Sequence, residues 1–142
     1  MTQVIWFRRD LRLADHPALH EAAAAGPVAC VFVVDPTILG RRHHDSPNRL
    51  AFLSAGLRAL DRALRERGGG LVILHGDPAE RLARFAGEHG AERVRALREI
   101  TPLGRDRDER VLRALAAAGV AFDPEPGDLV AEPEDIPCLL YT

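Results

Sequence analysis

Short apolar runs alternate along the chain with longer segments in which apolar positions recur every three or four residues. The apolar runs predict five strands, over residues 3–7, 28–34, 71–75, 93–97 and 120–123. The segments between them predict four helices, over residues 15–25, 46–68, 77–88 and 104–118. Strands that alternate with helices of this length are typical of βαβ units, whose parallel strands are covered by helices on both faces. We therefore expect an α/β fold, a Rossmann-like three-layer α/β/α arrangement around a five-stranded parallel sheet.

The expected helices begin at residues with cap chemistry. Asp15 opens the first helix and Ser46 opens the second, and a proline follows closely in each case. Asp77 and Glu80 form a capping box at the start of the third helix. A glycine follows each helix, which is the residue that most often ends one. The helix boundaries therefore rest on side-chain chemistry as well as on periodicity.

Four loops follow the predicted strands at one edge of the sheet. The carboxyl ends of parallel strands meet at that edge, and ligands of open α/β sheets bind there, where the strand order reverses. The second loop is long, and long connections in compact domains are often functional. We expect the functional site among these loops, which span residues 8–10, 35–45, 75–77 and 98–104.

Length and composition favour one globular domain. The 142 residues, 46% of them hydrophobic, predict a domain over 1–124, followed by an acidic, proline-rich tail over 125–142. The net charge of −2 gives no electrostatic footprint for nucleic acid, and no segment is long and apolar enough to cross a membrane. Cys30 and Cys138 have no disulfide or metal spacing, so both are expected to be buried thiols of a cytoplasmic protein.

Motifs of catalysis and metal binding are missing from the sequence. The segment RRHHD at 41–45 suggests a metal site, but two adjacent histidines do not easily face one ion and no distant ligand set completes it. Neither a phosphate-binding glycine loop nor a nucleophile elbow occurs. The charged residues 106–110 are typical of a solvated helix face, and His16, at a helix end, is expected to be partly exposed. We expect neither a metal ion nor a catalytic residue in this chain.

Several segments, in order, resemble the opening of the DNA photolyase and cryptochrome family. The segments are WFRRDLRL at 6–13, VFVVDPTIL at 31–39, RLAFLSAGLRAL at 49–60, LVILHGDPAERL at 71–82, PLGRDRD at 102–108, and AAGVAF with DLVAEP at 117–133. The resemblance implies a two-domain flavoprotein, with an N-terminal α/β domain that holds a light-harvesting antenna pigment and a larger helical domain that binds FAD and damaged DNA. The sequence matches the first domain, and the FAD-binding domain, its implied partner, is absent from this chain.

The resemblance also implies a pigment pocket. Members that carry a hydroxydeazaflavin use an arginine and an acidic residue, and Arg49 and Glu99 occupy those positions. Phe32 and Asp35, at the end of the second strand, would line the same pocket. A guanidinium and a carboxylate suit a pigment with ionisable ring oxygens and hydrogen-bonding ring nitrogens.

Folate-binding members differ from this sequence at one motif. They carry an Asn-Glu pair where this chain has Leu103 and Gly104, which favours hydroxydeazaflavin over methenyltetrahydrofolate. His43 matches a histidine of some folate-binding members, so the folate alternative stays open. Ala96 and Leu97 replace the family's usual Trp-Asn, and an empty pocket is therefore a further alternative.

The charged segment after the first strand is open to two interpretations. Arg8, Arg9, Asp10 and Arg12 either pair with one another on a solvated loop or face a ligand or a docking partner. The resemblance favours the second interpretation, in which this segment lies beside the pigment pocket and the partner domain, with exposed arginines as interface residues.

Three function hypotheses follow from these observations. The first is the antenna-pigment domain of a photolyase-like protein of light-driven DNA repair, without bond chemistry of its own. The second is a small nucleotide-binding or adenylylating enzyme on a similar sheet, although such enzymes normally show a glycine-serine phosphate loop where this chain has RRDLR. The third is a docking remnant with an empty pocket.

Overall fold

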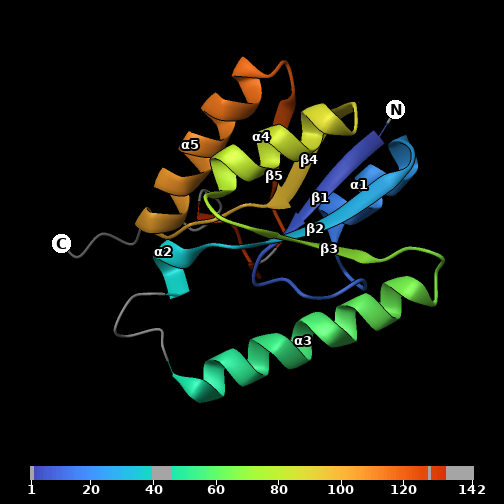
Figure 1. Cartoon of the computed structure of the whole chain (residues 1–142), viewed down its shortest axis with the longest axis vertical. Coiled ribbons are helices and arrows are strands. Elements are labelled where there is room, and N and C mark those ends of the chain that lie inside the picture. Colours follow the sequence, from blue (N-terminus) through green and yellow to red (C-terminus); the bar gives the residue numbers. More distant parts are fainter. Residues whose placement is uncertain (1, 40–45, 128, 134–142) are drawn as a thin grey trace.

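A computed structural model of the chain describes residues 2–39, 46–127 and 129–133 (Figure 1). The described residues form five strands and five helices. In chain order these are β1 (Thr2–Phe7), α1 (Pro17–Ala25), β2 (Val28–Val34), α2 (Pro36–Leu39), α3 (Pro47–Arg65), β3 (Leu71–His75), α4 (Pro78–Glu88), β4 (Ala91–Leu97), α5 (Pro102–Ala117) and β5 (Ala121–Glu125).

All five strands form one parallel sheet in the order β3-β2-β1-β4-β5. The central strand β1 pairs with β2 along its length, from Gln3 opposite Val28 to Phe7 opposite Phe32. The chain moves outward from β1 to β3, then crosses over to β4 on the other side of β1. The order of strands therefore reverses between β1 and β4, and the expected α/β fold with a parallel sheet is confirmed.

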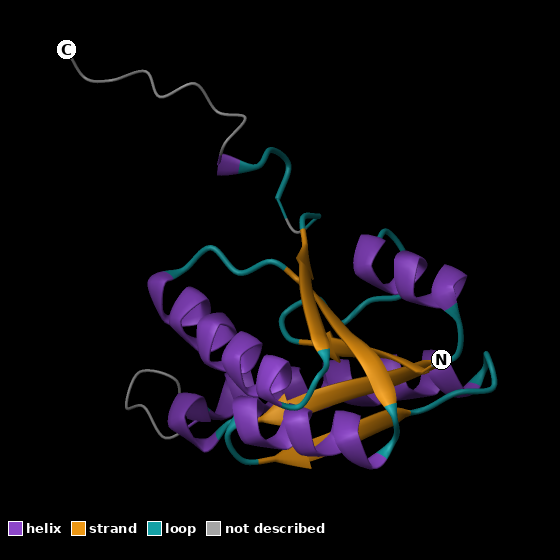
Figure 2. Cartoon of the chain, turned by 90° about the horizontal axis from the view of Figure 1, so that it is seen from above, coloured by secondary structure: helices purple, strands orange, loops and turns teal. Residues whose placement is uncertain are grey.

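Helices cover both faces of the sheet and form two hydrophobic cores (Figures 1 and 2). On one face, Trp6 and Val94 pack with Leu82 of α4 and Leu115 of α5. On the other face, the core contains Ile5, Phe7 and Phe32 from the strands and residues of α1 and α3. Side chains that alternate along β1 supply both cores, because successive residues of a strand point to opposite faces of the sheet.

Four local expectations need correction. His16 caps α1 in place of Asp15, and its Nδ1 accepts the backbone N–H of Leu19 at 3.1 Å. The expected partial exposure of His16 is wrong as well, because the residue is buried. Residues 36–39, expected in an extended loop, form the short helix α2, and α5 begins at Pro102, two residues before the expected start.

The last strand of the sheet ends close to the expected end of the domain. Strand β5 runs through Glu125, one residue past the boundary expected at 124.

Within the part of the chain that the structure describes, no helix has both the length and the apolarity that crossing a bilayer requires.

Candidate functional site

A cavity of about 470 Å³ opens at the carboxyl edge of the sheet, beside the point where the strand order reverses. Its walls come from the ends of β1 and β2 and the residues that follow them, from the segment after β4, and from helices α2, α3, α4 and α5. The volume lies in the range typical of small-molecule sites, roughly 300–1,000 Å³. The residues that line it are Trp6, Phe7, Arg8, Arg9, Phe32, Val33, Val34, Asp35, Leu39, Leu53, Pro78, Glu99, Thr101, Leu103, Gly104 and Arg107.

The predicted pigment residues are brought together in part. Phe32, Asp35 and Glu99, which are far apart in the sequence, all line this cavity. Arg49 is exposed in the first turn of α3 and is not among the lining residues. His43 lies outside the described residues. The roles assigned to Arg49 and His43 therefore stay predictions.

Glu99 is the anionic centre of the cavity. It is buried, and its carboxylate accepts hydrogen bonds from Arg9 at 3.1 Å and from Arg107 at 3.5 Å. The absence of a side chain at Gly104 makes room for it, since a Cβ there would lie 2.7 Å from Oε2 of Glu99 and 2.8 Å from Oγ1 of Thr101. Thr101 caps α5 by accepting the backbone N–H of Gly104 at 3.1 Å. The first turn of α5 and the position of Glu99 are therefore coupled.

Asp35, another residue of the cavity wall, also has a structural role. Its Oδ1 accepts the backbone N–H of Thr37 at 2.9 Å and the Thr37 hydroxyl at 2.7 Å. These bonds order the start of α2, which the sequence pattern alone did not predict. One carboxylate oxygen of Asp35 is thus committed to the fold.

Two guanidinium groups lie against the indole ring of Trp6. The Cζ of Arg8 is 4.6 Å from the ring centroid, and the Cζ of Arg107 is 5.1 Å from it. Both distances suit cation–π attraction, which strengthens when the groups are shielded from water. Two cationic groups therefore lie over the ring of Trp6, and all three residues line the cavity.

Arg8 is held inside the domain. Its guanidinium forms an ion pair with Asp108 and donates to the carbonyl oxygen of Leu97. Asp10 is buried too, and it accepts the backbone N–H of Arg8 at 2.7 Å. The expectation of exposed arginines is therefore wrong for Arg8 but holds for Arg9, whose side chain is 61% exposed.

Arg107 is a site residue that sequence reasoning missed. Burial lowers the pKa of its guanidinium, and the neighbouring charge of Arg8 lowers it further. Its Nε is buried without a hydrogen-bond partner among the described residues, although the terminal nitrogen bonds to Glu99. The available signal was helical spacing, because Arg107 follows Gly104 by three positions and so lies on the same face of α5. The solvated face expected for 106–110 is wrong at this position and at Asp108.

The chemistry of the cavity residues is suited to an organic ligand. Aromatic and aliphatic walls suit a flat apolar ring, and the guanidinium of Arg107 suits an acceptor atom at its edge. Across the residues described, no group of three or more His, Cys, Asp or Glu side chains is placed to hold a metal ion. Fold and cavity together define an α/β domain with a cavity of small-molecule size at the carboxyl edge of its sheet.

Comparison with known proteins gives the family. The family model for DNA photolyase matches residues 3–138, and the chain belongs to this family as its N-terminal α/β domain. The deoxyribodipyrimidine photo-lyase of Thermus thermophilus is 46% identical over 112 residues, covering 79% of this chain and 26% of that protein. The cryptochrome DASH of Natronomonas pharaonis is 34% identical over 141 residues, covering 96% of this chain and 30% of that protein.

Solved structures agree with this assignment. A cryptochrome from Synechocystis superposes with a TM-score of 0.89 at 28% identity, covering 96% of this chain and 29% of that chain. An archaeal photolyase from Sulfolobus tokodaii, described with two FAD molecules, superposes with a TM-score of 0.86 at 28% identity, covering 93% of this chain and 31% of that chain. The chain spans roughly a quarter to a third of the length of these relatives.

Proposed function

We propose that this domain binds a planar light-harvesting pigment in the cavity at the carboxyl edge of the sheet. The observation that carries the proposal is the convergence of Phe32, Asp35 and Glu99 on one cavity that Arg107 also lines. The resemblance of the sequence to the photolyase family predicts all three as pocket residues independently of this geometry.

A hydroxydeazaflavin fits the chemistry of these residues. The guanidinium of Arg107 can donate to a ring oxygen, and the carboxylates of Asp35 and Glu99 can accept from ring N–H groups. Phe32 and Trp6 supply apolar surface for the ring system. When bound, such a pigment absorbs near-ultraviolet or blue light and passes the excitation to a flavin held elsewhere.

The activity of the longer relatives enters only as part of the proposal. In a full-length photolyase the flavin donates an electron to a pyrimidine dimer in DNA, and the residues for that step belong to a separate domain. For docking to such a domain, Arg9 is the best placed of the four predicted residues because its side chain is exposed. Arg12 donates to the carbonyl oxygen of Gly127 at 3.3 Å and would position the segment that follows β5. Arg8 and Asp10 would support this surface from inside.

The proposal is tested by titrating the purified protein with 8-hydroxy-5-deazaflavin and with methenyltetrahydrofolate, and by following pigment absorbance and fluorescence. We expect the deazaflavin to bind more tightly than the folate. Leu103→Trp, which places a large side chain at the cavity wall, should abolish binding. Leu112→Trp is the matched control, because both leucines lie on α5 with similar exposure, 43% and 48%, and Leu112 is not among the lining residues.

Two results would overturn this proposal. One is the binding of neither pigment by the folded wild-type protein. The other is equal binding by the wild type and Leu103→Trp, which would place the pigment elsewhere on the domain.

A further inference from the structure

Trp6 is the single tryptophan of the chain, and it lies in the wall of the pigment cavity. Indole is among the most easily oxidised side-chain rings, and an aromatic pigment in its excited state readily takes an electron. Such a transfer would leave the indole as a radical cation and the pigment with one extra electron, and the absorbed energy would be lost when the electron returned. A domain that harvests light in this cavity therefore needs Trp6 to keep its electron.

Two positive charges lie over the ring of Trp6. The Cζ atoms of Arg8 and Arg107 are 4.6 and 5.1 Å from the ring centroid. Both side chains are largely buried, with 5% and 14% exposed, so water screens their charges poorly. The guanidinium groups attract the π electrons of the neutral indole and would repel an indole radical cation. Both arginines therefore oppose the loss of an electron from Trp6.

The two arginines are held at the ring although they repel each other. Burial lowers the pKa of the Arg107 guanidinium, and the charge of Arg8 lowers it further. Each has a counterion, Asp108 for Arg8 and Glu99 for Arg107, which binds a terminal nitrogen and offsets part of the positive charge. Removal of either arginine takes a cation from the ring and leaves a carboxylate without its counterion. Both changes make oxidation of Trp6 easier.

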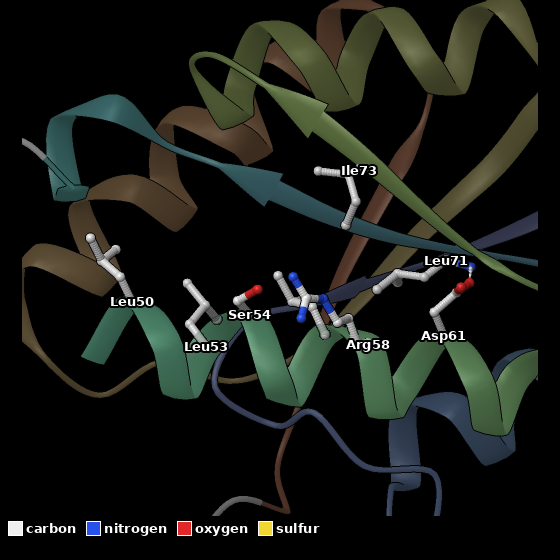
Figure 3. Close-up of a pocket in the computed structure, with 8 residues that line it drawn as sticks. Leu50, Leu53, Ser54, Arg58, Asp61, Leu71 and Ile73 are labelled. Atoms are coloured by element: carbon white, nitrogen blue, oxygen red, sulfur yellow. Dashed lines mark hydrogen bonds between the residues drawn. The ribbon is translucent and has the colours of Figure 1, made fainter. Parts of the chain in front are cut away.

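A second hollow of the domain has a different arrangement (Figure 3). It is a groove of about 330 Å³ between α3 and β3, and Arg58 is one of the residues that line it. The walls of this groove are mostly aliphatic, and among the described residues that line it none is aromatic. Arg58 is therefore a matched control, an arginine that lines a hollow without an indole beside it.

We propose that Arg8 and Arg107 raise the oxidation potential of Trp6, and that this protects the excited state of a pigment in the cavity from quenching by Trp6. In this role the two arginines are positioning residues, because they act through the indole. The protective role rests on the proposed function, since it takes the pigment to occupy this cavity. The raised potential is a property of the unliganded domain and is measured without any pigment.

Square-wave voltammetry of the unliganded protein tests the raised potential. Every sample carries Tyr141→Phe, which removes the only phenol of the chain, so the ring that is oxidised is that of Trp6. We expect Arg107→Gln to favour oxidation of Trp6 by about tenfold in the equilibrium constant. Arg107→Lys keeps the positive charge and should keep most of the raised potential, and Arg58→Gln should leave the potential unchanged. An unchanged potential in Arg107→Gln would overturn the proposal.

A second pair of substitutions covers the case in which Arg107→Gln does not fold or does not bind pigment. Arg8→Gln combined with Asp108→Asn removes the other ring cation together with its counterion. Circular dichroism establishes which variants are folded. The potential of Trp6 should fall in this double variant as well, and a potential equal to that of the wild type would count against the proposal.

The fluorescence lifetime of bound 8-hydroxy-5-deazaflavin tests the protective role. Trp6→Phe alone should leave the lifetime unchanged, because the protected indole does not quench the pigment. Arg107→Gln should shorten the lifetime about twofold or more, and adding Trp6→Phe should restore it. Arg58→Gln should have no effect. A longer lifetime in Trp6→Phe alone would mean that Trp6 quenches the pigment despite its arginines, and the proposal would be wrong.

The two measurements separate this inference from the proposed function. If the folded wild type does not bind the pigment, the proposed function fails, and the protective role fails with it whatever the potential of Trp6. If the pigment binds but neither arginine affects the potential of Trp6 or the lifetime of the pigment, this inference is wrong and the pigment site stands.

Discussion

Oδ2 of Asp10 lies 2.5 Å from Nε2 of His16, and both side chains are buried. The other acceptor atoms of the pair are used as well. Oδ1 of Asp10 accepts the N–H of Arg8 at 2.7 Å, and Nδ1 of His16 accepts the N–H of Leu19 at 3.1 Å. Because Nδ1 is an acceptor, this hydrogen-bond network assigns the ring proton to Nε2, which then donates to Asp10. The pair therefore ties the loop after β1 to the start of α1.

Two substitutions of His16 separate its role as the cap of α1 from its hydrogen bond to Asp10. We expect His16→Ala to lower the free energy of unfolding by about 2–3 kcal/mol, because it removes the helix cap and one hydrogen bond to a buried carboxylate. His16→Asn should cost less, about 1 kcal/mol, since asparagine is itself a good cap. Urea denaturation followed by circular dichroism measures both. Equal losses in the two variants would mean that the cap contributes nothing.

The Asp10 carboxyl predicts a specific pH dependence of stability. Burial raises its pKa, but the hydrogen bonds from His16 and from the N–H of Arg8 outweigh burial, so the pKa is lowered from its ordinary value of 3.8. An acid whose pKa is lower in the folded state stabilises the fold above its unfolded pKa, and this contribution is lost as pH falls through the folded pKa. Asp10 therefore contributes fully near neutral pH and loses its contribution below about pH 4.

The measurement compares wild type and Asp10→Asn at several pH values. The wild type should be the more stable at pH 7, and the difference should shrink as the pH falls below 4. Asp108 acts in the opposite direction, because burial raises its pKa despite the attraction of Arg8. A difference between wild type and Asp10→Asn that stays constant from pH 7 to pH 2.5 would contradict the lowered pKa of Asp10.

Gly104 and Gly87 should respond in opposite ways to alanine. A Cβ at Gly104 would meet Glu99 and Thr101 at less than 3.0 Å, so Gly104→Ala must displace the Glu99 side chain or the start of α5. We expect a loss of about 1–3 kcal/mol in unfolding free energy and weaker pigment binding. At Gly87, within α4, a Cβ would meet nothing within 4 Å, and Gly87→Ala should add roughly 0.5–1 kcal/mol through helix propensity. Thermal denaturation of both variants measures the two changes in stability. A destabilised Gly87→Ala variant together with an unchanged stability of Gly104→Ala would contradict both expectations.

The sheet could be predicted from the sequence because its signals are local. Apolar runs such as VACVFVV at 28–34 are long enough to identify strands without tertiary information, and glycine or cap residues mark the helix ends. His16 shows the limit of these rules. Its ring caps α1 because Asp10, six positions earlier, fixes the orientation of the ring. The residue preferences of helix caps do not include such a contact, so they do not predict this cap.

Only some of the cavity residues could be predicted from the sequence, because local patterns do not contain long-range contacts. Phe32, Asp35 and Glu99 lie at or just after the ends of strands, and parallel topology brings such positions to one edge. Arg107 belongs to a helix that looks solvated in the sequence, and its burial depends on Trp6, about a hundred positions away. The burial of Arg8 likewise depends on Asp108. Long-range pairs between charged side chains leave no periodic trace in the sequence.

The adjacent arginines Arg8 and Arg9 give a direct test of the difference between internal support and exposed surface. Arg8 is buried against Trp6 and paired with Asp108, whereas Arg9 is exposed and reaches Glu99 from outside. Arg8→Gln leaves the Asp108 carboxylate without its counterion, and we expect it to lose about 3–5 kcal/mol of unfolding free energy. Arg9→Gln should lose less than about 1 kcal/mol, as is typical of an exposed ion pair.

A double substitution keeps the Arg8 prediction testable where Arg8→Gln folds poorly. Arg8→Gln combined with Asp108→Asn removes both charges, so it should recover a measurable part of the stability lost in Arg8→Gln. The fluorescence of Trp6, the single tryptophan of the chain, reports unfolding in each variant. If Arg8→Gln and Arg9→Gln unfold at the same urea concentration, or if the double variant is no more stable than Arg8→Gln, the Arg8–Asp108 pair does not support the cavity from inside.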